Sequence, residues 1–311
     1  MINKYDSPKD ELLELIRLGR KYKWAKGETR RNLERAGVNL GRHDFYSETP
    51  SLDEIDASFE YADGKPPFFD KEVFDLDVNV ATAKDLISSA ASFDAPIDGD
   101  SGYFWNNGQF SSVDALAYYG LIKKLKPKNV IEIGSGFSTH IAHQAVHENK
   151  TGKLTCIDPC PRTEITELSD VEFLQKPIQE IDRDWLFSTL KPGDLLFYDG
   201  SHTIKTGSDT VYFYLKILPY LPAGVLVHAH DVGLPYPRNK RAMIEAKIYW
   251  GEQYILMAHL LNTQRYKVVF GTHFLQKEKM EVLEELMGDR YKIGGGSLWY
   301  EILGESAIKR K

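Results

Sequence analysis

The sequence of 311 residues is poor in cysteine and has no long apolar run. Its two cysteines, Cys156 and Cys160, flank the end of one expected strand, so their side chains are poorly placed for a disulfide, and no second pair exists for a zinc site. No stretch is apolar enough to span a bilayer, and the first residues lack the apolar segment of a signal peptide. These absences predict a cytoplasmic protein without a membrane span.

An excess of positive charge is also missing. The formal net charge is −6 and the isoelectric point is near 5.9, whereas a general nucleic-acid binder needs a basic face for phosphate contacts. The sequence therefore predicts no nucleic-acid partner and favours a small-molecule ligand. No sequence motif indicates the oligomeric state, and a homo-oligomer is compatible with the sequence.

The length and patterning indicate two parts. From residue 103 onward helical and strand patterns alternate, which is typical of a Rossmann-like α/β fold with a mostly parallel sheet and helices on both faces. Residues 1–102 show amphipathic helical spacing over 8–20, a basic segment over 20–42 and an acidic segment over 51–80. We therefore expect a mainly helical N-terminal cap, for substrate or oligomerisation, over 1–102 and a ligand-binding domain over 103–311.

Seven strands are expected in the second part. Apolar runs and their breakers place strands at 129–134, 153–158, 171–174, 194–199, 225–231, 266–270 and 296–302. The intervening helices are expected at 111–126, 138–148, 208–220 and 239–261.

A tight turn with two glycines follows the first of these strands. Glu132 precedes the turn, Gly134 and Gly136 form it, and a helix is expected to begin directly after it. Such a turn lets a nucleotide-like ligand approach the backbone closely. The third glycine of a dinucleotide fingerprint is replaced by Thr139, which favours S-adenosylmethionine (SAM), a cofactor without a pyrophosphate, over NAD.

The next strand ends in Asp158, 22 residues beyond Gly136, where a doubly wound sheet places the acid that binds a ribose. With these residues the chain resembles the class I SAM-dependent methyltransferases. The resemblance covers roughly residues 103–302 and implies a sheet of order 3-2-1-4-5-7-6 with an antiparallel seventh strand. It implies these cofactor-binding residues: Glu132, Gly134, Ser135, Gly136, Ser138, Asp158, Gln179 and Asp199.

The fourth and fifth strands both end in an aspartate. In the expected order these strands are neighbours, so Asp199 and Asp231 would lie close together, within reach of one divalent ion. His202 and His230 stand next to them in sequence and could accept a proton from a hydroxyl. We therefore expect Asp199, His202, His230 and Asp231 to be catalytic, and Asp199, His230 and Asp231 to bind Mg²⁺ or another divalent metal; the alternative is that the histidines are only hydrogen-bonded.

A narrower resemblance, to sugar and natural-product O-methyltransferases such as macrocin O-methyltransferase and to cephalosporin-hydroxylase-like proteins, rests on segments 199–202, 205–209, 221–231 and 295–299. It implies a role in polysaccharide or natural-product biosynthesis. Several relatives hold magnesium at carboxylates that match Asp199 and Asp231, but they often have a second acid where this chain has His230.

Four further residues are expected to face the acceptor: Trp105, Lys205, Tyr236 and Arg238. Arg238 would suit a carboxylate or a phosphate, and Trp105 could stack on a sugar face. For two of them a structural role is an open alternative, since Lys205 lies at the entry of a helix and Trp105 could join two cores.

The sequence therefore predicts a SAM-dependent O-methyltransferase that acts on a sugar or natural-product hydroxyl. Two alternatives stay open: a metal-dependent hydroxylase on the same scaffold, and a non-catalytic partner protein that binds SAM or a nucleoside.

Overall fold

Seven strands form one sheet in the order β3-β2-β1-β4-β5-β7-β6, as expected. The structure is a computed structural model that describes residues 9–41, 43–261 and 263–304. The first five strands are parallel, and β7 runs antiparallel to both β5 and β6. The strands are β1 (Asn129–Ile133), β2 (Lys153–Ile157), β3 (Val171–Leu174), β4 (Leu195–Tyr198), β5 (Leu226–Ala229), β6 (Tyr266–Gly271) and β7 (Leu298–Ile302).

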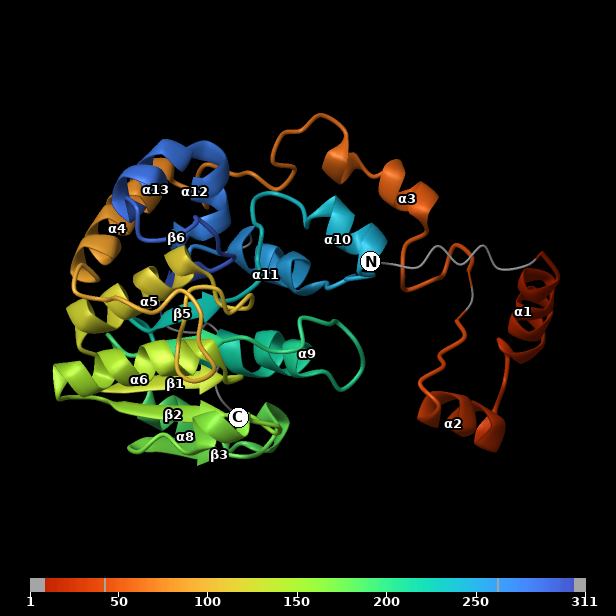
Figure 1. Cartoon of the computed structure of the whole chain (residues 1–311), viewed down its shortest axis with the longest axis horizontal. Coiled ribbons are helices and arrows are strands. Elements are labelled where there is room, and N and C mark those ends of the chain that lie inside the picture. Colours follow the sequence, from red (N-terminus) through yellow and green to blue (C-terminus); the bar gives the residue numbers. More distant parts are fainter. Residues whose placement is uncertain (1–8, 42, 262, 305–311) are drawn as a thin grey trace. The chain divides into compact units, whose positions relative to one another are not determined.

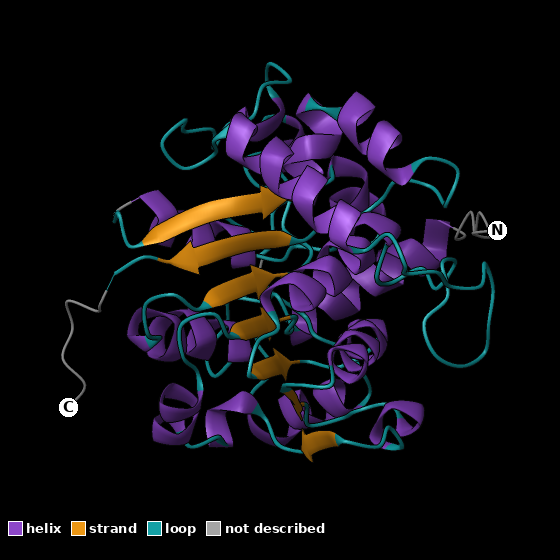
Figure 2. Ribbon diagram, turned by 90° about the vertical axis from the view of Figure 1, so that its left-hand side faces the viewer, coloured by secondary structure: helices purple, strands orange, loops and turns teal. Residues whose placement is uncertain are grey.

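Helices cover both faces of this sheet (Figure 2). The helices from residue 76 onward are α4 (Leu76–Ser89), α5 (Ser112–Leu125), α6 (Phe137–Asn149), α7 (Thr163–Thr166), α8 (Arg183–Thr189), α9 (Asp209–Tyr212), α10 (Lys240–Glu245), α11 (Glu252–Leu261), α12 (Thr272–Glu278) and α13 (Met280–Met287). Short 3₁₀ turns lie at Phe59–Tyr61, Ile178–Glu180 and Leu218–Tyr220, and a π-helical segment at Phe213–Ile217.

The core has two layers because successive strand residues point to opposite faces. Leu196 and Tyr198 of β4 pack in one layer, against side chains of α8, α9 and α11. Leu195 and Phe197 pack in the other layer, against side chains of α4, α5 and α6. Both faces of the central strands are therefore buried, which explains their near-continuous apolar sequences.

One helix that the sequence pattern did not predict, α4, lies alongside α5 (Figure 1). Asp75 begins α4 by accepting a hydrogen bond from the Val78 amide at 3.0 Å. At the crossing, a Cβ on Gly120 of α5 would collide with the Leu86 carbonyl of α4. A glycine at this position therefore permits the close approach of the two helices.

The predicted helix over 239–261 is wrong as one element. It is interrupted between α10 and α11, where Lys247 has a left-handed φ of 54° and the Gly251 amide donates a hydrogen bond to the His202 carbonyl. The helix predicted over 208–220 begins as expected, because Ser208 accepts from the Val211 amide at 3.2 Å. It then widens into the π-helical segment, so only its first turn is a regular α-helix.

The chain divides into one unit up to Ala57 and a second from Ser58. Residues 58–102 thus belong to the unit that contains the sheet, and a distinct role for residues 1–102 stays a prediction. The first unit contains α1 (Lys9–Tyr22), α2 (Gly27–Arg35) and α3 (Leu52–Asp56), the last with a capping box between Ser51 and Glu54.

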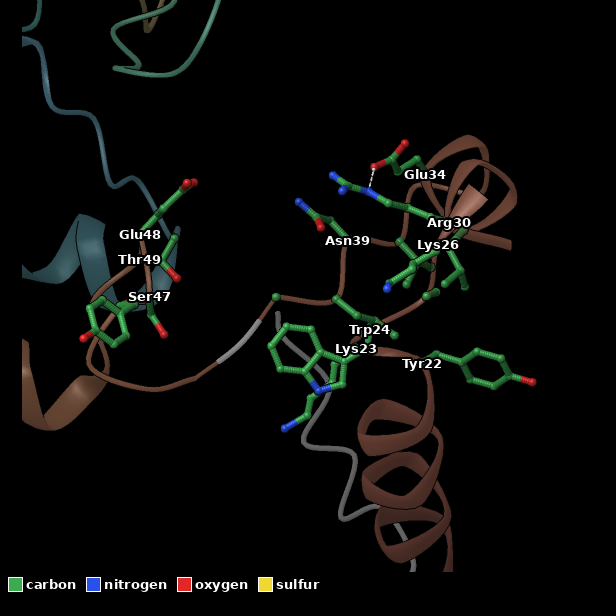
Figure 3. A pocket seen from close by; sticks show the side chains of 16 residues that line it. Tyr22, Lys23, Trp24, Lys26, Arg30, Glu34, Asn39, Ser47, Glu48 and Thr49 are labelled. Atoms are coloured by element: carbon green, nitrogen blue, oxygen red, sulfur yellow. Dashed lines mark hydrogen bonds and ion pairs between the residues drawn. The ribbon is translucent and has the colours of Figure 1, made fainter. Parts of the chain in front are cut away.

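A hollow of about 650 Å³ lies within the first unit (Figure 3). Its wall includes Trp24, Lys26 and the pair Arg30 and Glu34, which are joined by a hydrogen bond of 2.7 Å. None of the predicted site residues lines this hollow. Across the described residues of both units, no helix is long and apolar enough to cross a membrane.

Candidate active site

The turn between β1 and α6 is built around Gly134. Its φ is +91°, a conformation that L side chains rarely adopt, and a Cβ there would collide with the carbonyl of Asp199 at the end of β4. The turn therefore packs closely against the carboxyl end of β4. Gly136 is different: its φ of 175° is ordinary extended backbone, and nothing lies within 4 Å of where its Cβ would be.

Glu132 supports this turn from inside the protein. It is fully buried and accepts hydrogen bonds from the Tyr118 hydroxyl at 3.0 Å and the Thr139 hydroxyl at 2.6 Å. Thr139 Oγ1 in turn accepts from the Gly136 amide at 3.1 Å. Burial raises the pKa of Glu132 to about 7, against the lowering effect of these donors. Glu132 therefore supports the turn through Tyr118 and Thr139, and the direct contact with the cofactor that was expected for it stays a prediction.

A cavity of about 430 Å³ opens at the carboxyl ends of β1, β2 and β4. Asp158 lies in its wall, with Oδ2 accepting from the Ser135 hydroxyl at 2.7 Å and Oδ1 from the Cys160 amide at 2.8 Å. The cavity residues are Ile133, Gly134, Ile157, Asp158, Pro159, Pro177, Ile178, Gln179, Asp199, Gly200, Ser201, Lys205, Gly207, Ser208 and Asp209.

Four of the predicted cofactor residues therefore share one cavity: Gly134, Asp158, Gln179 and Asp199. Gln179 donates to the Gly207 carbonyl at 2.9 Å, while its buried Oε1 has no hydrogen-bond partner among the described residues. A free amide oxygen could accept a hydrogen bond from an amino group such as that of adenine. Gly136 and Ser138 do not line the cavity, and Ser138 is buried in the first turn of α6.

Beside this cavity the structure brings together the four predicted catalytic residues. His202 Nε2 lies 3.3 Å from Asp199 Oδ1 and 3.7 Å from Asp231 Oδ2. His230 Nδ1 lies 3.5 Å from Asp199 Oδ2 and 3.9 Å from Asp231 Oδ2. Both imidazoles are buried, while the two carboxylates keep 36% and 43% of their side-chain surface exposed. The carboxylates are thus the part of this cluster that a ligand can reach.

Each imidazole is backed by a buried carboxylate that sequence reasoning missed. Glu252 Oε2 lies 2.7 Å from His202 Nδ1, and Asp114 Oδ2 lies 3.5 Å from His230 Nε2. Asp114 also accepts from the Thr272 hydroxyl at 2.6 Å and from the Gly296 amide at 2.8 Å. In the sequence Asp114 is a lone acid in a mainly apolar helical segment, whereas Glu252 carries no such signal, because the helix predicted over 239–261 contains other charged residues.

The charges in the cluster stabilise one another. Burial by itself would lower the pKa of His202, but Asp199 and Glu252 outweigh it and raise the pKa to about 9. Burial likewise opposes the protonated form of His230, yet Asp199 and Asp114 hold its pKa well above the usual range. For Asp199 burial would raise the pKa, but the two imidazoles hold it well below the ordinary value. The acidic surroundings therefore favour the cationic form of both imidazoles.

The residues as placed do not fit a metal ion. Among the described residues, no group of three or more His, Cys, Asp and Glu side chains is arranged to hold one. The donor set of two carboxylates and two imidazoles also departs from the all-oxygen environment that Mg²⁺ prefers. Metal binding at Asp199, His230 and Asp231 stays a prediction.

The predicted acceptor residues do not all reach this cluster. Arg238 does, because its Nη1 donates to the Asp231 carbonyl at 2.8 Å and its guanidinium lies 4.6 Å from the ring centre of Trp250. Lys205 lines the cofactor cavity instead. Tyr236 is hydrogen-bonded to Glu278 of α12.

Trp105 is 4% exposed and packs among Phe93, Tyr103 and Tyr291. It therefore belongs to the hydrophobic core, which is the structural alternative given above for this residue. His228 is also a core residue: its ring stacks on Phe197 with centres 3.9 Å apart, and burial holds its pKa well below the usual range.

A parallel sheet with a glycine turn after β1, an acid at the end of β2 and a ligand cavity at the strand ends defines a class I nucleoside-cofactor enzyme fold. The family model Methyltransf_24, described as a methyltransferase domain, matches residues 131–232, the segment that contains these features. The chain therefore contains a methyltransferase domain, within a sheet that has the class I methyltransferase topology.

A relative in Archaeoglobus fulgidus, described as an uncharacterized protein, is 31% identical over 161 residues, which is 47% of this chain and 72% of the relative. Two solved structures are similar at 14% identity, each over 72% of this chain. They are the SAH-bound methyltransferase PaMTH1 of Podospora anserina (88% of that chain, TM-score 0.39) and the O-methyltransferase TomG of Streptomyces achromogenes (90% of that chain, TM-score 0.38).

Proposed function

We propose that this methyltransferase transfers the methyl group of SAM to a hydroxyl oxygen of a small acceptor, a sugar or a natural product. One observation carries the proposal: Asp199 belongs both to the cofactor cavity and to the carboxylate–imidazole cluster. A donor in the cavity and a hydroxyl held at the cluster would therefore meet at one residue. Proximity of this kind is the main requirement of an in-line displacement.

In this proposal the two half-exposed carboxylates of Asp199 and Asp231 hold the acceptor hydroxyl. Its proton passes to His202 or His230, which must first be neutral. In the free protein their acidic surroundings favour the protonated form of both. A positive charge bound beside Asp199 in the cavity, such as the sulfonium of SAM, lowers the imidazole pKa and favours the neutral base.

A divalent metal is a further expectation from the family resemblance, and no step above depends on it. The same holds for a cytoplasmic location, a homo-oligomer and a role in polysaccharide or natural-product biosynthesis. A hydroxylase-like activity on this scaffold would need a metal at the cluster, so metal dependence separates that alternative from the proposed one.

The first test is calorimetric titration of chelator-stripped protein with SAM and with S-adenosylhomocysteine, with and without a divalent metal. Methyl transfer from labelled SAM is then measured over a panel of sugar and natural-product hydroxyls. We expect binding of both ligands and transfer to at least one hydroxyl. No binding under any condition would remove the cofactor assignment for this cavity.

A substitution separates catalysis from cofactor binding alone. Asp231→Asn should keep SAM affinity, because Asp231 does not line the cofactor cavity, and should lose turnover. Asp289→Asn, at an exposed position after α13, is the control. Equal transfer rates in the wild-type protein and Asp231→Asn would contradict the proposed role of the cluster.

A further inference from the structure

The loop after β4 is clamped to the start of α11. His202 has a left-handed φ of 57°, which a non-glycine residue adopts only when its surroundings require it. Its carbonyl accepts hydrogen bonds from the amides of Gly251 and Glu252, at 3.1 and 3.2 Å. The backbone of His202 is thus fixed by the same turn that interrupts the expected helix over 239–261.

The His202 side chain is fixed by that turn as well. Its Nδ1 lies 2.7 Å from Oε2 of Glu252, and Oε1 of Glu252 accepts from the Tyr214 hydroxyl at 2.7 Å. Glu252 is 1% exposed, so both of its oxygens are committed to protein partners. The indole of Trp250 covers the imidazole, with ring centres 4.3 Å apart.

This chain of contacts determines which ring nitrogen faces the carboxylate cluster. Burial raises the pKa of Glu252, and the hydrogen bonds from His202 and Tyr214 oppose this effect. An ionised carboxylate accepts hydrogen bonds only, so the ionised form of Glu252 takes its hydrogen bond from a proton on Nδ1 of His202. Nε2 is then the nitrogen that faces Asp199 and Asp231. A base that is oriented through its other nitrogen by a buried carboxylate is a recurrent arrangement in enzymes.

We propose that Glu252 is a positioning residue for methyl transfer, which holds His202 with Nε2 directed at the space between the Asp199 and Asp231 carboxylates, and that Tyr214 holds Glu252 in turn. This inference rests on the proposed function. It explains why Glu252, which does not line the cavity, is buried at the first residue of α11.

The variant Glu252→Gln keeps the size of the side chain and removes its charge. Nitrogen-15 histidine NMR should show a strongly hydrogen-bonded, downfield Nδ1 proton for His202 in the wild-type protein, assigned by its absence in His202→Gln. We expect this signal to shift upfield in Glu252→Gln. With an acceptor in hand, kcat should fall on the order of 10- to 100-fold, with KM for SAM changed less than twofold.

The matched control is Glu285→Gln, at an exposed position of α13, which should leave the NMR signal, kcat and thermal stability unchanged. A second variant, Tyr214→Phe, should reduce kcat less than Glu252→Gln does. An unchanged Nδ1 signal in Glu252→Gln, or an unchanged kcat, would overturn the inference. Failure of the wild-type protein to methylate any acceptor would refute the proposed function, while the NMR comparison would still decide the role of Glu252.

Discussion

The hydroxyl of Ser135 donates a hydrogen bond of 2.7 Å to the carboxylate of Asp158, which ties the glycine turn after β1 to the end of β2. The other oxygen of Asp158 is held by the Cys160 amide. The carboxylate is thus oriented in the cavity wall before any ligand binds. Such preorganisation reduces the loss of conformational entropy on ligand binding.

Asp158→Ala should therefore weaken SAM binding. Loss of a charged hydrogen-bond acceptor is worth about 1.5–3 kcal/mol, which corresponds to roughly a 10- to 100-fold higher Kd. Ser135→Ala should have a smaller effect, because the carboxylate remains. Isothermal titration of both variants against the wild-type protein measures the difference, and an unchanged Kd for Asp158→Ala would place the ribose elsewhere.

The two glycines of the turn should respond differently to alanine. At Gly134 the positive φ and the collision with Asp199 predict a loss of stability on the order of 1–3 kcal/mol. At Gly136 the backbone accepts alanine and the surroundings are open, so stability should change little. If the cofactor approaches this backbone, however, Gly136→Ala should still weaken SAM binding.

Thermal denaturation and SAM titration of the same two variants make this comparison. Gly136→Ala serves as the control for stability. A lower melting temperature of Gly134→Ala would show that the turn packs closely against the Asp199 carbonyl. Equal melting temperatures for the two variants would contradict the packing of the turn on β4.

The strands and the turn could be predicted from the sequence because their signals are local. Mainly apolar runs that end in Asp158, Asp199 and Asp231 specify buried parallel strands with acids at one sheet edge. The sheet order then brings the last two acids together, as expected.

The missed features depend on contacts between distant segments. Glu252 meets His202 across 50 residues and Asp114 meets His230 across 116, so no spacing rule connects them. The break between α10 and α11 has the same origin, since its amides bond to the His202 carbonyl. The sequence does not separate the two roles open to Trp105, because an aromatic side chain near a site and one in a core look alike in sequence.

Glu132 should make stability depend on pH. Its pKa of about 7 in the folded protein lies above the ordinary value of 4.5, so the folded state binds the proton more tightly than the unfolded state. This contribution is fully present below pH 4.5 and is lost as the pH rises through 7. The total loss is about 3 kcal/mol.

Glu132→Gln should remove that loss, so its unfolding free energy should decline less than the wild-type value between pH 5 and pH 8. Urea denaturation at both pH values measures this difference, and the histidines of the active site titrate equally in both proteins. Parallel pH profiles would show that Glu132 is ionised throughout this range.

Arg238 should determine the affinity for the acceptor if that molecule has an anionic group. Its guanidinium is fixed by the Asp231 carbonyl and the Trp250 ring, next to the carboxylate cluster, and planar guanidinium groups bind carboxylates and phosphates well. Arg238→Ala should then raise the acceptor KM roughly 10-fold or more, in line with the loss of a charged hydrogen bond, without changing the Kd of SAM.

Arg241 provides the matched control, because it is exposed and forms an ion pair of 2.7 Å with Glu245, which lies in α10 as Arg241 does. Arg241→Ala should leave both constants unchanged. Steady-state kinetics over charged and neutral acceptors from the panel decide the point: a KM increase in Arg238→Ala limited to anionic acceptors supports charge recognition. An equal increase for neutral acceptors would mean that Arg238 acts by holding the loop after Asp231, since its hydrogen bond to that carbonyl is lost in either case.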